Sequence, residues 1–535
     1  MPNVASIQPT ELKKFINDGN ELALVDVREQ GVFGQSHLLY AVCIPLSHLE
    51  LRVRYLLPRF GVRLVVMDGG DGSSLATTAA RKLAELGYTD IHIMEGGAAG
   101  WQTAGYELFS GVNVPSKAFG EFVEHAYDTP RLTAGSLKAR IDAGEDIVIL
   151  DSRPYGEYHR MSIPGGVDTP GAELVYRVHD IAPDPGTTVV VNCAGRTRSI
   201  IGAQSLINAG IANPVMALEN GTMGWHLAGL DVAKGATAMA PPPSPQGLEK
   251  AKACAARVAA RFGVETVDLA TVQAWQTDDT RTLFVLDVRT TEEFEAGHLP
   301  GSRHAPGGQL VQGTDEFAGV RNARLALVDD SGVRATMTAS WLLQMGWSDV
   351  RVLEGGIGDA GIETRPNRPE RPPALVIERV SAADLAAELV SPKPPLVLDL
   401  DTSLVYRDGH IPGAWWGVRS RFMHDIKNLP YGLDIIVTSG DGVIAPYAAA
   451  EIPEHRPGAR VRVLDGGTAS WRGAALPLEE GIANPLGPHD DVQYKPYDNQ
   501  GGVEAAMRAY LSWETALVEQ IERDGDARFR AFPAS

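Results

Sequence analysis

The sequence predicts an α/β protein built from four copies of one small unit, each a mainly parallel sheet with helices on both faces, followed by a helical C-terminal tail. Three observations support this. A short apolar run that ends in an acid occurs four times. A second short signature follows each run at almost the same distance. Between the two signatures, strand-like and helix-like segments alternate, which is typical of right-handed crossovers in a parallel sheet.

The first signature predicts a buried strand that ends at an acidic residue. Short apolar runs bounded by polar residues are typical of such strands. The four copies are "LALVDVR" with Asp26, "IVILDSR" with Asp151, "LFVLDVR" with Asp287 and "LVLDLD" with Asp399.

A second signature follows the first at a nearly constant distance in each unit. Its copies are "IMEGGAAGW", "ALENGTMGW", "VLEGGIGDAG" and "VLDGGTASW", with the acids Glu95, Glu219, Glu354 and Asp465. The acids of the two signatures are separated by 69, 68, 67 and 66 residues in chain order. The chain is therefore four copies of one unit of roughly 110 to 135 residues, which is too long for a solenoid repeat and has the size of a small domain. We therefore expect domains at 1–110, 111–238, 239–368 and 369–486, with proline-rich linkers near 239–247 and 364–374.

The second unit shows the expected order of elements most clearly. "TTVVVN" predicts a strand, "TRSIIGAQSLINAG" a helix with Gly210 as its C-cap, and "PVMALENG" the next strand. The first unit repeats this order in "RLVVMD", "LATTAARKLAELG" and "IHIMEGG". The tail, 487–535, has no copy elsewhere. Its segment "EAAMRAYLSWETALVEQIERD" predicts an amphipathic helix docked on a neighbouring domain.

Composition excludes several classes of protein. A net charge of −19 argues against binding to nucleic acid or to anionic membranes. Three cysteines in 535 residues cannot form a disulfide framework and fit a reducing compartment. The N-terminal segment lacks the pattern of a secretory signal, and no apolar run is long enough to span a membrane. We expect a cytoplasmic protein with no metal ion or cofactor.

Cys193 is the strongest candidate for a catalytic residue. It lies in "VVVNCAGRTRSI", where a predicted strand ends and a helix begins a few residues later. The free N–H groups of such a loop and of the helix N-terminus form a site for an anion, and so favour a thiolate. Arg196 and Arg198 add positive charge. A thiolate in this setting is a nucleophile suited to an anionic substrate.

The other loop residues support this interpretation. Gly195 permits a tight turn and Ser199 is expected to cap the helix. The predicted substrate-binding residues are Ala194, Gly195, Arg196, Thr197, Arg198 and Ser199. Arg177 and His179 either reach the site or lie in a solvated loop. Cys43 and Cys254 lack a comparable context and are expected to be core or helix-packing residues.

These motifs together resemble rhodanese-type sulfurtransferases. "CAGRTRS" is similar to the active-site loop of that family, "LDVRTTEEFEAGHLPGSRHAP" and "DGHIPGAWW" to its entry motif, and the repeated "EGG" signature to its closing motif. The resemblance covers nearly the whole chain except the tail. One departure is Ser162, where the family usually has a histidine; His298 and His410 keep it and are expected to be structural hydrogen-bonding residues.

The resemblance implies a two-step sulfur relay. The Cys193 thiolate takes the outer sulfur of a donor such as thiosulfate, and the resulting persulfide passes that sulfur to cyanide or to a thiol. Loops of the mercaptopyruvate type are small and neutral after the cysteine, so two arginines favour a dianionic sulfonate donor. Arg196 is the expected sulfonate ligand, whereas Arg198 either joins it or points to solvent.

Two other functions remain open at this stage. A cysteine phosphatase or arsenate reductase needs five residues between its cysteine and arginine, and here four separate Cys193 from Arg198. A non-enzymatic sulfur carrier or interaction scaffold would accept one sulfur per chain and then stop without a partner protein.

The other three units lack a cysteine at this position. Equivalent counting reaches Asp68 in the first unit, Asp329 in the third and Ser439 in the fourth. A carboxylate can itself accept hydrogen bonds from the loop N–H groups. We therefore expect the first and third loops to be folded but chemically silent, or, if the sequence has drifted, their acids to point to solvent.

Overall fold

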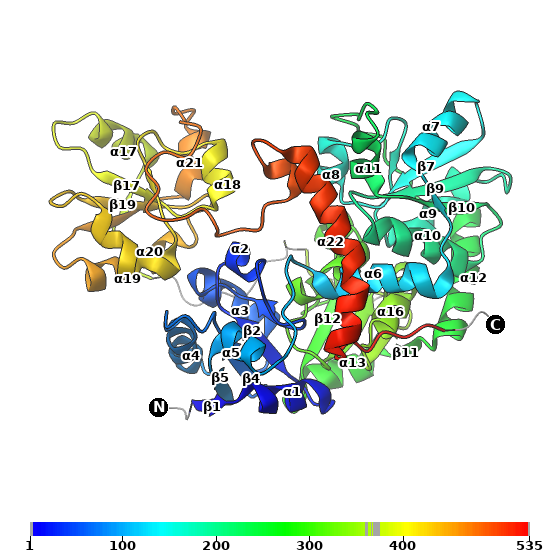
Figure 1. The fold of residues 1–535 in the computed structure, drawn as a ribbon, viewed down its shortest axis with the longest axis horizontal. Helices are drawn as coiled ribbons and strands as arrows, with labels where there is room; N and C mark the ends of the chain where they lie inside the picture. The colour runs from blue at the N-terminus through cyan, green and yellow to red at the C-terminus, as the bar shows by residue number, and fades with distance from the viewer. Residues whose placement is uncertain (1–3, 359–361, 365, 367–374, 533–535) are drawn as a thin grey trace.

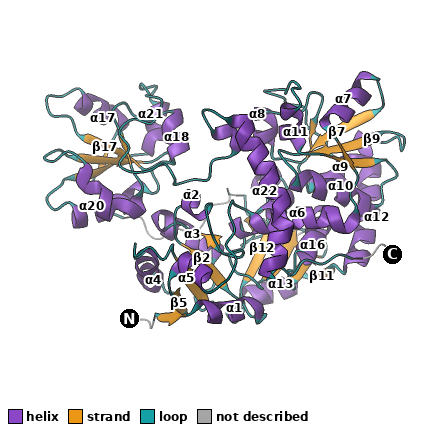
Figure 2. Cartoon of the chain, in the orientation of Figure 1, coloured by secondary structure: helices purple, strands orange, loops and turns teal. Residues whose placement is uncertain are grey.

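The computed structural model describes residues 4–358, 362–364, 366 and 375–532. It contains four five-stranded sheets, one in each of the four units expected from the sequence (Figures 1 and 2). If the five strands of a sheet are numbered along the chain, their spatial order is 1-5-4-2-3 in every sheet, and neighbouring strands pair in parallel. The prediction of a repeated, mainly parallel α/β unit is confirmed.

The first two units have these elements. The first contains β1 (Ala5–Ile7), α1 (Pro9–Asn17), β2 (Ala23–Asp26), α2 (Gln30–Phe33), β3 (Val42–Cys43), α3 (Leu49–Leu56), β4 (Leu64–Met67), α4 (Leu75–Glu85), β5 (Ile91–Met94) and α5 (Gly97–Thr103). The second contains α6 (Val114–Tyr127), β6 (Arg131–Leu132), α7 (Ala134–Asp142), β7 (Ile147–Asp151), α8 (Tyr155–Arg160), β8 (Val167–Asp168), α9 (Glu173–Ile181), β9 (Thr188–Asn192), α10 (Thr197–Ala209), β10 (Val215–Leu218) and α11 (Gly221–Leu227).

The remaining units follow the same order. The third contains α12 (Pro245–Phe262), β11 (Glu265–Val267), α13 (Leu269–Gln276), β12 (Leu283–Asp287), α14 (Thr291–Ala296), β13 (Arg303–His304), α15 (Gly307–Gln312), β14 (Arg324–Val328), α16 (Val333–Gln344) and β15 (Val350–Leu353). The fourth contains β16 (Arg379–Val380), α17 (Ala382–Leu389), β17 (Leu396–Asp399), α18 (Ser403–Asp408), β18 (Trp415–Trp416), α19 (Phe422–Asp425), β19 (Ile435–Thr438), α20 (Ala445–His455), β20 (Val461–Leu464) and α21 (Gly467–Gly473), and the tail adds α22 (Val503–Asp524).

The four strand-end acids lie where the sequence predicts them. Asp26, Asp151, Asp287 and Asp399 are the last residues of β2, β7, β12 and β17. The predicted C-cap of α10 is also confirmed, since Gly210 follows its last residue with φ +70°. Part of the second predicted linker, residues 365 and 367–374, and the end of the third closing signature, residues 359–361, lie outside the described residues.

The first three units pack as one body, and the fourth has its own core. One hydrophobic cluster includes Val66 of β4, Val191 of β9 and Leu327 of β14. The core residues of the fourth unit form separate clusters. In Figure 1 the fourth unit stands apart at the left, and α22 crosses the middle of the molecule beside α6. The predicted docking of the tail helix is confirmed.

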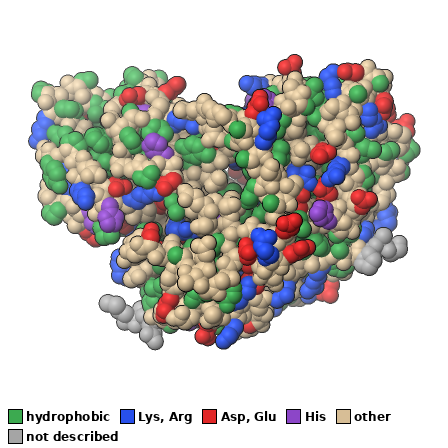
Figure 3. All heavy atoms as spheres, in the orientation of Figure 1, with side chains coloured by type: hydrophobic (Ala, Val, Ile, Leu, Met, Phe, Trp, Pro, Cys, Tyr) green, Lys and Arg blue, Asp and Glu red, His purple; other side chains and the backbone are tan. Residues whose placement is uncertain are grey.

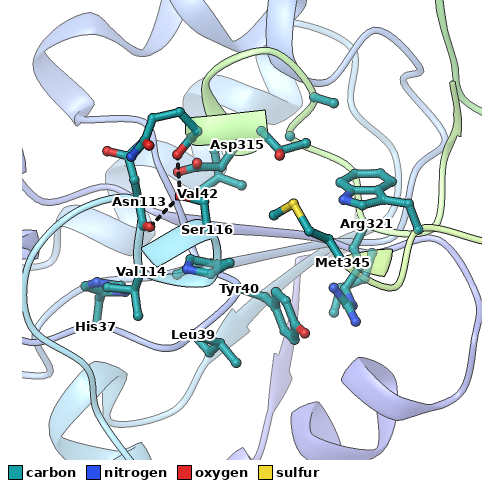
Figure 4. Close-up of a pocket in the computed structure, with 18 of the residues that line it drawn as sticks. His37, Leu39, Tyr40, Val42, Asn113, Val114, Ser116, Asp315, Arg321 and Met345 are labelled. Atoms are coloured by element: carbon teal, nitrogen blue, oxygen red, sulfur yellow. Dashed lines mark hydrogen bonds between the residues drawn. The ribbon is translucent and has the colours of Figure 1, made fainter. Parts of the chain in front are cut away.

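Buried contacts fix the junction of the first and third units. Figure 4 shows a small cavity there, about 60 Å³, between residues of the first unit, the start of α6 and the third unit. The Ser116 hydroxyl donates to the carbonyls of Asn113, at 3.0 Å, and of Gln312. These bonds hold the first turn of α6 against α15.

Side chains of both charges are mixed over the face drawn in Figure 3. Among the described residues, no helix has both the length and the apolar content needed to cross a membrane.

Candidate active site

The Cys193 loop is held by the N-terminus of α11. The Thr222 N–H donates to the Cys193 carbonyl at 2.8 Å, and the Met223 N–H to the Ala194 carbonyl at 3.0 Å. Gly221 adopts φ +53°, and a Cβ there would lie 2.4 Å from the Cys193 carbonyl oxygen. This close approach explains why the closing signature repeats a glycine. A side chain at that position would collide with the backbone of the loop. Gly97, Gly356 and Gly467 lie in the same way against Asp68, Asp329 and Ser439.

The entry signature also supports the loop. Asp151 and Arg153 form a buried bidentate pair, with Nε–Oδ1 at 2.8 Å and Nη2–Oδ2 at 2.7 Å. The Asn192 amide donates to Asp151 at 2.9 Å and to Thr222 at 3.0 Å. This network fixes the end of β9 directly before Cys193. The fourth unit differs, because Asp401 stands where the others have an arginine.

Cys193 is buried, with 2% of its surface exposed, next to a cavity of about 650 Å³. The loop contributes Ala194 and Arg198 to the cavity wall. Three other parts of the chain complete it: the first unit, α15 and the residues that follow it, and the C-terminal tail. Representative lining residues are Gln30, Gln309, Gln312, Tyr497, Tyr510 and Trp513. The second unit alone therefore does not form this site.

Arg198 faces the cavity. Its Nη1 and Nη2 bind the two carboxylate oxygens of Glu157 at 3.1 and 2.8 Å. Burial opposes the charge of Arg198, but Glu157 and the nearby Cys193 sulfur raise its pKa above the ordinary value. Burial also opposes the charge of Glu157, yet Arg198 holds the pKa of that carboxyl at about 2. Both side chains are therefore charged at neutral pH.

Arg196 does not face the cavity, contrary to the expectation from the sequence. Its guanidinium binds the Glu121 carboxylate at 2.6 and 2.8 Å and Glu124 at 2.5 Å, both on α6. All three side chains are less than 10% exposed. The guanidinium makes a bidentate, charge-assisted pair with Glu121 and a further bond to Glu124, which accounts for its direction. Arg196 thus fastens the loop to α6.

The remaining loop residues have structural contacts. Ser199 does not cap α10; the N-cap is Arg196, and the Ser199 hydroxyl donates to the Arg196 carbonyl at 2.7 Å. Thr197 donates to Glu514 of α22 at 3.4 Å. A Cβ on Gly195 would lie 2.9 Å from a Glu514 oxygen. The absence of a side chain at Gly195 therefore leaves room for the tail helix to pack against the loop.

The equivalent loops of the first and third units hold their own carboxylates. Asp68 accepts the N–H groups of Gly70 at 2.9 Å and Ala76 at 3.0 Å. Asp329 accepts those of Gly332 at 2.5 Å and Arg334 at 2.9 Å. The prediction that these acids occupy their own loops is confirmed. In the fourth unit, the buried Ser439 hydroxyl has no hydrogen-bond partner among the described residues.

The other candidate residues pack in the core or pair with neighbouring side chains and carbonyls. Cys43 is buried on β3, and Cys254 is buried on α12 with its sulfur 3.5 Å from His179. Arg177 binds Glu173 within α9. The expected structural role of the two histidines is confirmed: His298 and His410 contact the carbonyls of Phe294 and Tyr406 at 2.8 Å and stack on those rings.

The cavity also includes residues that the sequence did not single out. Lys117 comes from α6, Glu157 from α8, Met223 from α11 and Tyr510 from α22. Nothing in the sequence links them to Cys193. The only feature of the sequence that pointed to them was the amphipathic helix of the tail. Its apolar face had to pack on one of the repeated units.

The comparisons with known proteins agree with this architecture. The family model described as "Rhodanese-like domain" matches residues 8–104, 133–228, 269–359 and 381–474. These matches cover more than half of the chain. The protein therefore belongs to the rhodanese family, and it carries four rhodanese-like domains in tandem.

Two of the similar proteins are named as thiosulfate sulfurtransferases, and a third is named as a transcriptional regulator. The chain is similar to a crystal structure titled thiosulfate sulfurtransferase from Pseudomonas aeruginosa, with 47% identity, a TM-score of 0.94, and coverage of 99% of this chain and 100% of that one. It is 27% identical to a "Putative thiosulfate sulfurtransferase" of Synechococcus elongatus over 37% of this chain and 80% of that protein. It is 33% identical to an HTH-type transcriptional regulator of Mycobacterium tuberculosis over 20% of this chain, a match that spans under half of the regulator, 45%.

Proposed function

We propose that the protein is a thiosulfate sulfurtransferase that moves sulfane sulfur to cyanide or to a thiol through a persulfide on Cys193. One observation carries the proposal: of the four equivalent loop positions, only that of the second domain holds a thiol, and it lies beside a cavity that Arg198 faces. The name of the relative that matches the whole chain supports thiosulfate as the donor.

The first step forms the persulfide. The Cys193 thiolate attacks the outer sulfur of thiosulfate, and a new S–S bond forms. The bond between the two sulfur atoms of thiosulfate breaks, and its electron pair leaves with sulfite. Arg198 binds the sulfonate oxygens and stabilises the charge that accumulates on the leaving sulfite. Its partner Glu157 orients the guanidinium.

The second step regenerates the thiolate. Cyanide, or a deprotonated thiol, attacks the outer sulfur of the persulfide. The S–S bond breaks, the electron pair returns to Cys193, and thiocyanate or a new persulfide leaves. Because Cys193 is buried, the acceptor must enter through the cavity. We place the protein in a reducing compartment such as the cytoplasm, since all three cysteines are free.

The test is steady-state turnover of thiosulfate with cyanide by the intact chain. Sustained turnover that disappears in Cys193→Ser supports the proposal. One sulfur accepted per chain without turnover would favour a carrier or scaffold instead. Hydrolysis of a phosphate ester with no sulfur transfer would favour a phosphatase.

A further inference from the structure

Among the described residues, three cationic side chains line the Cys193 cavity: Arg198, Lys117 and Lys495. Lys495 is exposed, whereas Lys117 is buried at 7% exposure. We propose that Lys117 is the second cation that binds the anionic group of the donor, and that Tyr510 and Glu514 of the C-terminal helix hold it in place. This inference rests on the proposed function, and it gives Lys117 the part that the sequence suggested for Arg196.

Three groups of the tail position the Lys117 ammonium. It donates to Glu514 Oε1 at 3.1 Å and to the Tyr510 hydroxyl. It also lies 4.8 Å from the centre of the Tyr510 ring and 5.6 Å from that of Trp513. An ammonium has three N–H donors, and two of them are used by these hydrogen bonds. The third is available for a ligand in the cavity that Lys117 lines.

The two cations differ in where their counter-ions lie. Glu157, the partner of Arg198, also lines the cavity, whereas Glu514 does not. Glu514 is 1% exposed and lies against Gly195 and Thr197 of the loop. The cavity side of the Lys117–Glu514 pair is therefore positive, which suits a dianion.

Tyr510 connects this pair to the loop that carries Cys193. Its hydroxyl donates to Glu514 at 3.0 Å, and a Cβ on Gly195 would lie 3.3 Å from its ring. Burial, followed by the Glu514 charge, raises the pKa of Tyr510 well above its ordinary value, so it stays a neutral donor. We assign Tyr510 and Glu514 as positioning residues, because both act on the donor through Lys117.

The backbone on both sides of the pair is fixed. Ser116, directly before Lys117, ties α6 to Gln312 of the third domain (Figure 4). On the tail, Met507 and Leu511 pack on Met223, with Ala194 beside them. The position of the Lys117 ammonium thus depends on α6, on the third domain and on the tail. The role of the tail is to hold this cation at the cavity.

The test compares the alkylation of Cys193 by iodoacetate, an anion, with that by neutral iodoacetamide. The variants are Lys117→Gln, Lys117→Arg and, as a matched control, Lys13→Gln. Lys13 binds Asp526 at 2.7 Å near the far end of α22, so its loss loosens the tail without touching the cavity. The readout is the ratio of the two rate constants, measured by mass spectrometry of the Cys193 peptide.

We expect Lys117→Gln to lower the iodoacetate-to-iodoacetamide ratio by roughly ten- to a hundredfold, in line with the loss of one charge-assisted hydrogen bond. Lys117→Arg should restore most of the ratio, and Lys13→Gln should leave it within about twofold of wild type. An unchanged ratio in Lys117→Gln, or an equal fall in Lys13→Gln, would overturn the inference.

A second variant keeps the test decisive if Lys117→Gln leaves Glu514 buried without a counter-ion and fails to fold. Lys117→Gln with Glu514→Gln removes both charges, and the ratio should still fall. For thiosulfate, Lys117→Gln and the double variant Lys117→Gln with Glu514→Gln should each raise KM more than they lower kcat. A purely structural role for Lys117 would not produce this difference. Alkylation needs no sulfur donor, so failure of the proposed function leaves this result interpretable.

Discussion

Arg196 and Arg198 lie two residues apart in one loop. The structure predicts that loss of Arg198 lowers activity, whereas loss of Arg196 lowers stability. In Arg198→Gln the sulfonate loses a charge-assisted hydrogen bond of about 1.5–3 kcal/mol, so kcat/KM for thiosulfate should fall by roughly ten- to a hundredfold. In Arg196→Gln two carboxylates with at most 9% exposure lose their guanidinium. Removing one partner of a buried ion pair costs about 3–5 kcal/mol of stability.

The assay for this prediction has two parts. Thiosulfate kinetics should show KM within about twofold of wild type for Arg196→Gln, because this side chain makes no contact with the cavity. Urea unfolding should show its midpoint lowered by about 1–2 M, as expected from that loss of stability and a slope of about 3 kcal/mol per molar urea, the upper end of the usual range because the slope grows with protein size. A large rise in KM for Arg196→Gln, with wild-type kinetics for Arg198→Gln, would refute our assignment of the two arginines.

Three further predictions concern other parts of the chain. Cys193→Ser should abolish sulfur transfer, while Cys43→Ser and Cys254→Ser should keep turnover within about threefold because both thiols are buried away from the cavity; substantial activity in Cys193→Ser would contradict this. Asp329→Cys in a Cys193→Ser background should give a thiol that iodoacetamide alkylates faster than a free thiol near neutral pH, because the loop N–H groups that now bind Asp329 would stabilise a thiolate; ordinary reactivity would mean that the loop has lost this property. Burial raises the pKa of Glu29 from 4.5 to about 7, so the contribution of Glu29 to stability should fall as pH rises from about 4.5 to about 7, and Glu29→Gln should stabilise the protein relative to wild type by up to ~3 kcal/mol at pH 8 but not at pH 4 in urea unfolding; an equal gain at both pH values would count against it.

The repeated fold could be predicted because each unit carries its own local signals. The strand-end acid marks where β2, β7, β12 and β17 end, and the small residues of the closing signature mark where the chain must approach the loop. These requirements act within one domain and between nearby residues. They therefore leave a pattern in the sequence that repeats with every domain.

The site could be predicted only in part, since its cavity is formed between domains. The cysteine, its loop and the carboxylates that occupy the loops of the first and third domains follow from local chemistry. The direction of Arg196 does not, because its partners Glu121 and Glu124 lie about 75 residues upstream on a helix of their own. Lys117 and Tyr510 are brought together from positions 393 residues apart. No spacing rule connects such residues, and only the packed structure shows that the tail reaches the loop.

The most direct test of the central claim is the intact mass of the protein after treatment with thiosulfate and removal of excess reagent. Our account predicts that wild type gains the mass of one sulfur atom, that the added sulfur maps to the peptide containing Cys193, and that cyanide removes it as thiocyanate. Cys193→Ser should gain nothing. An unchanged mass in wild type, or sulfur added to Cys43 or Cys254 instead, would contradict the account.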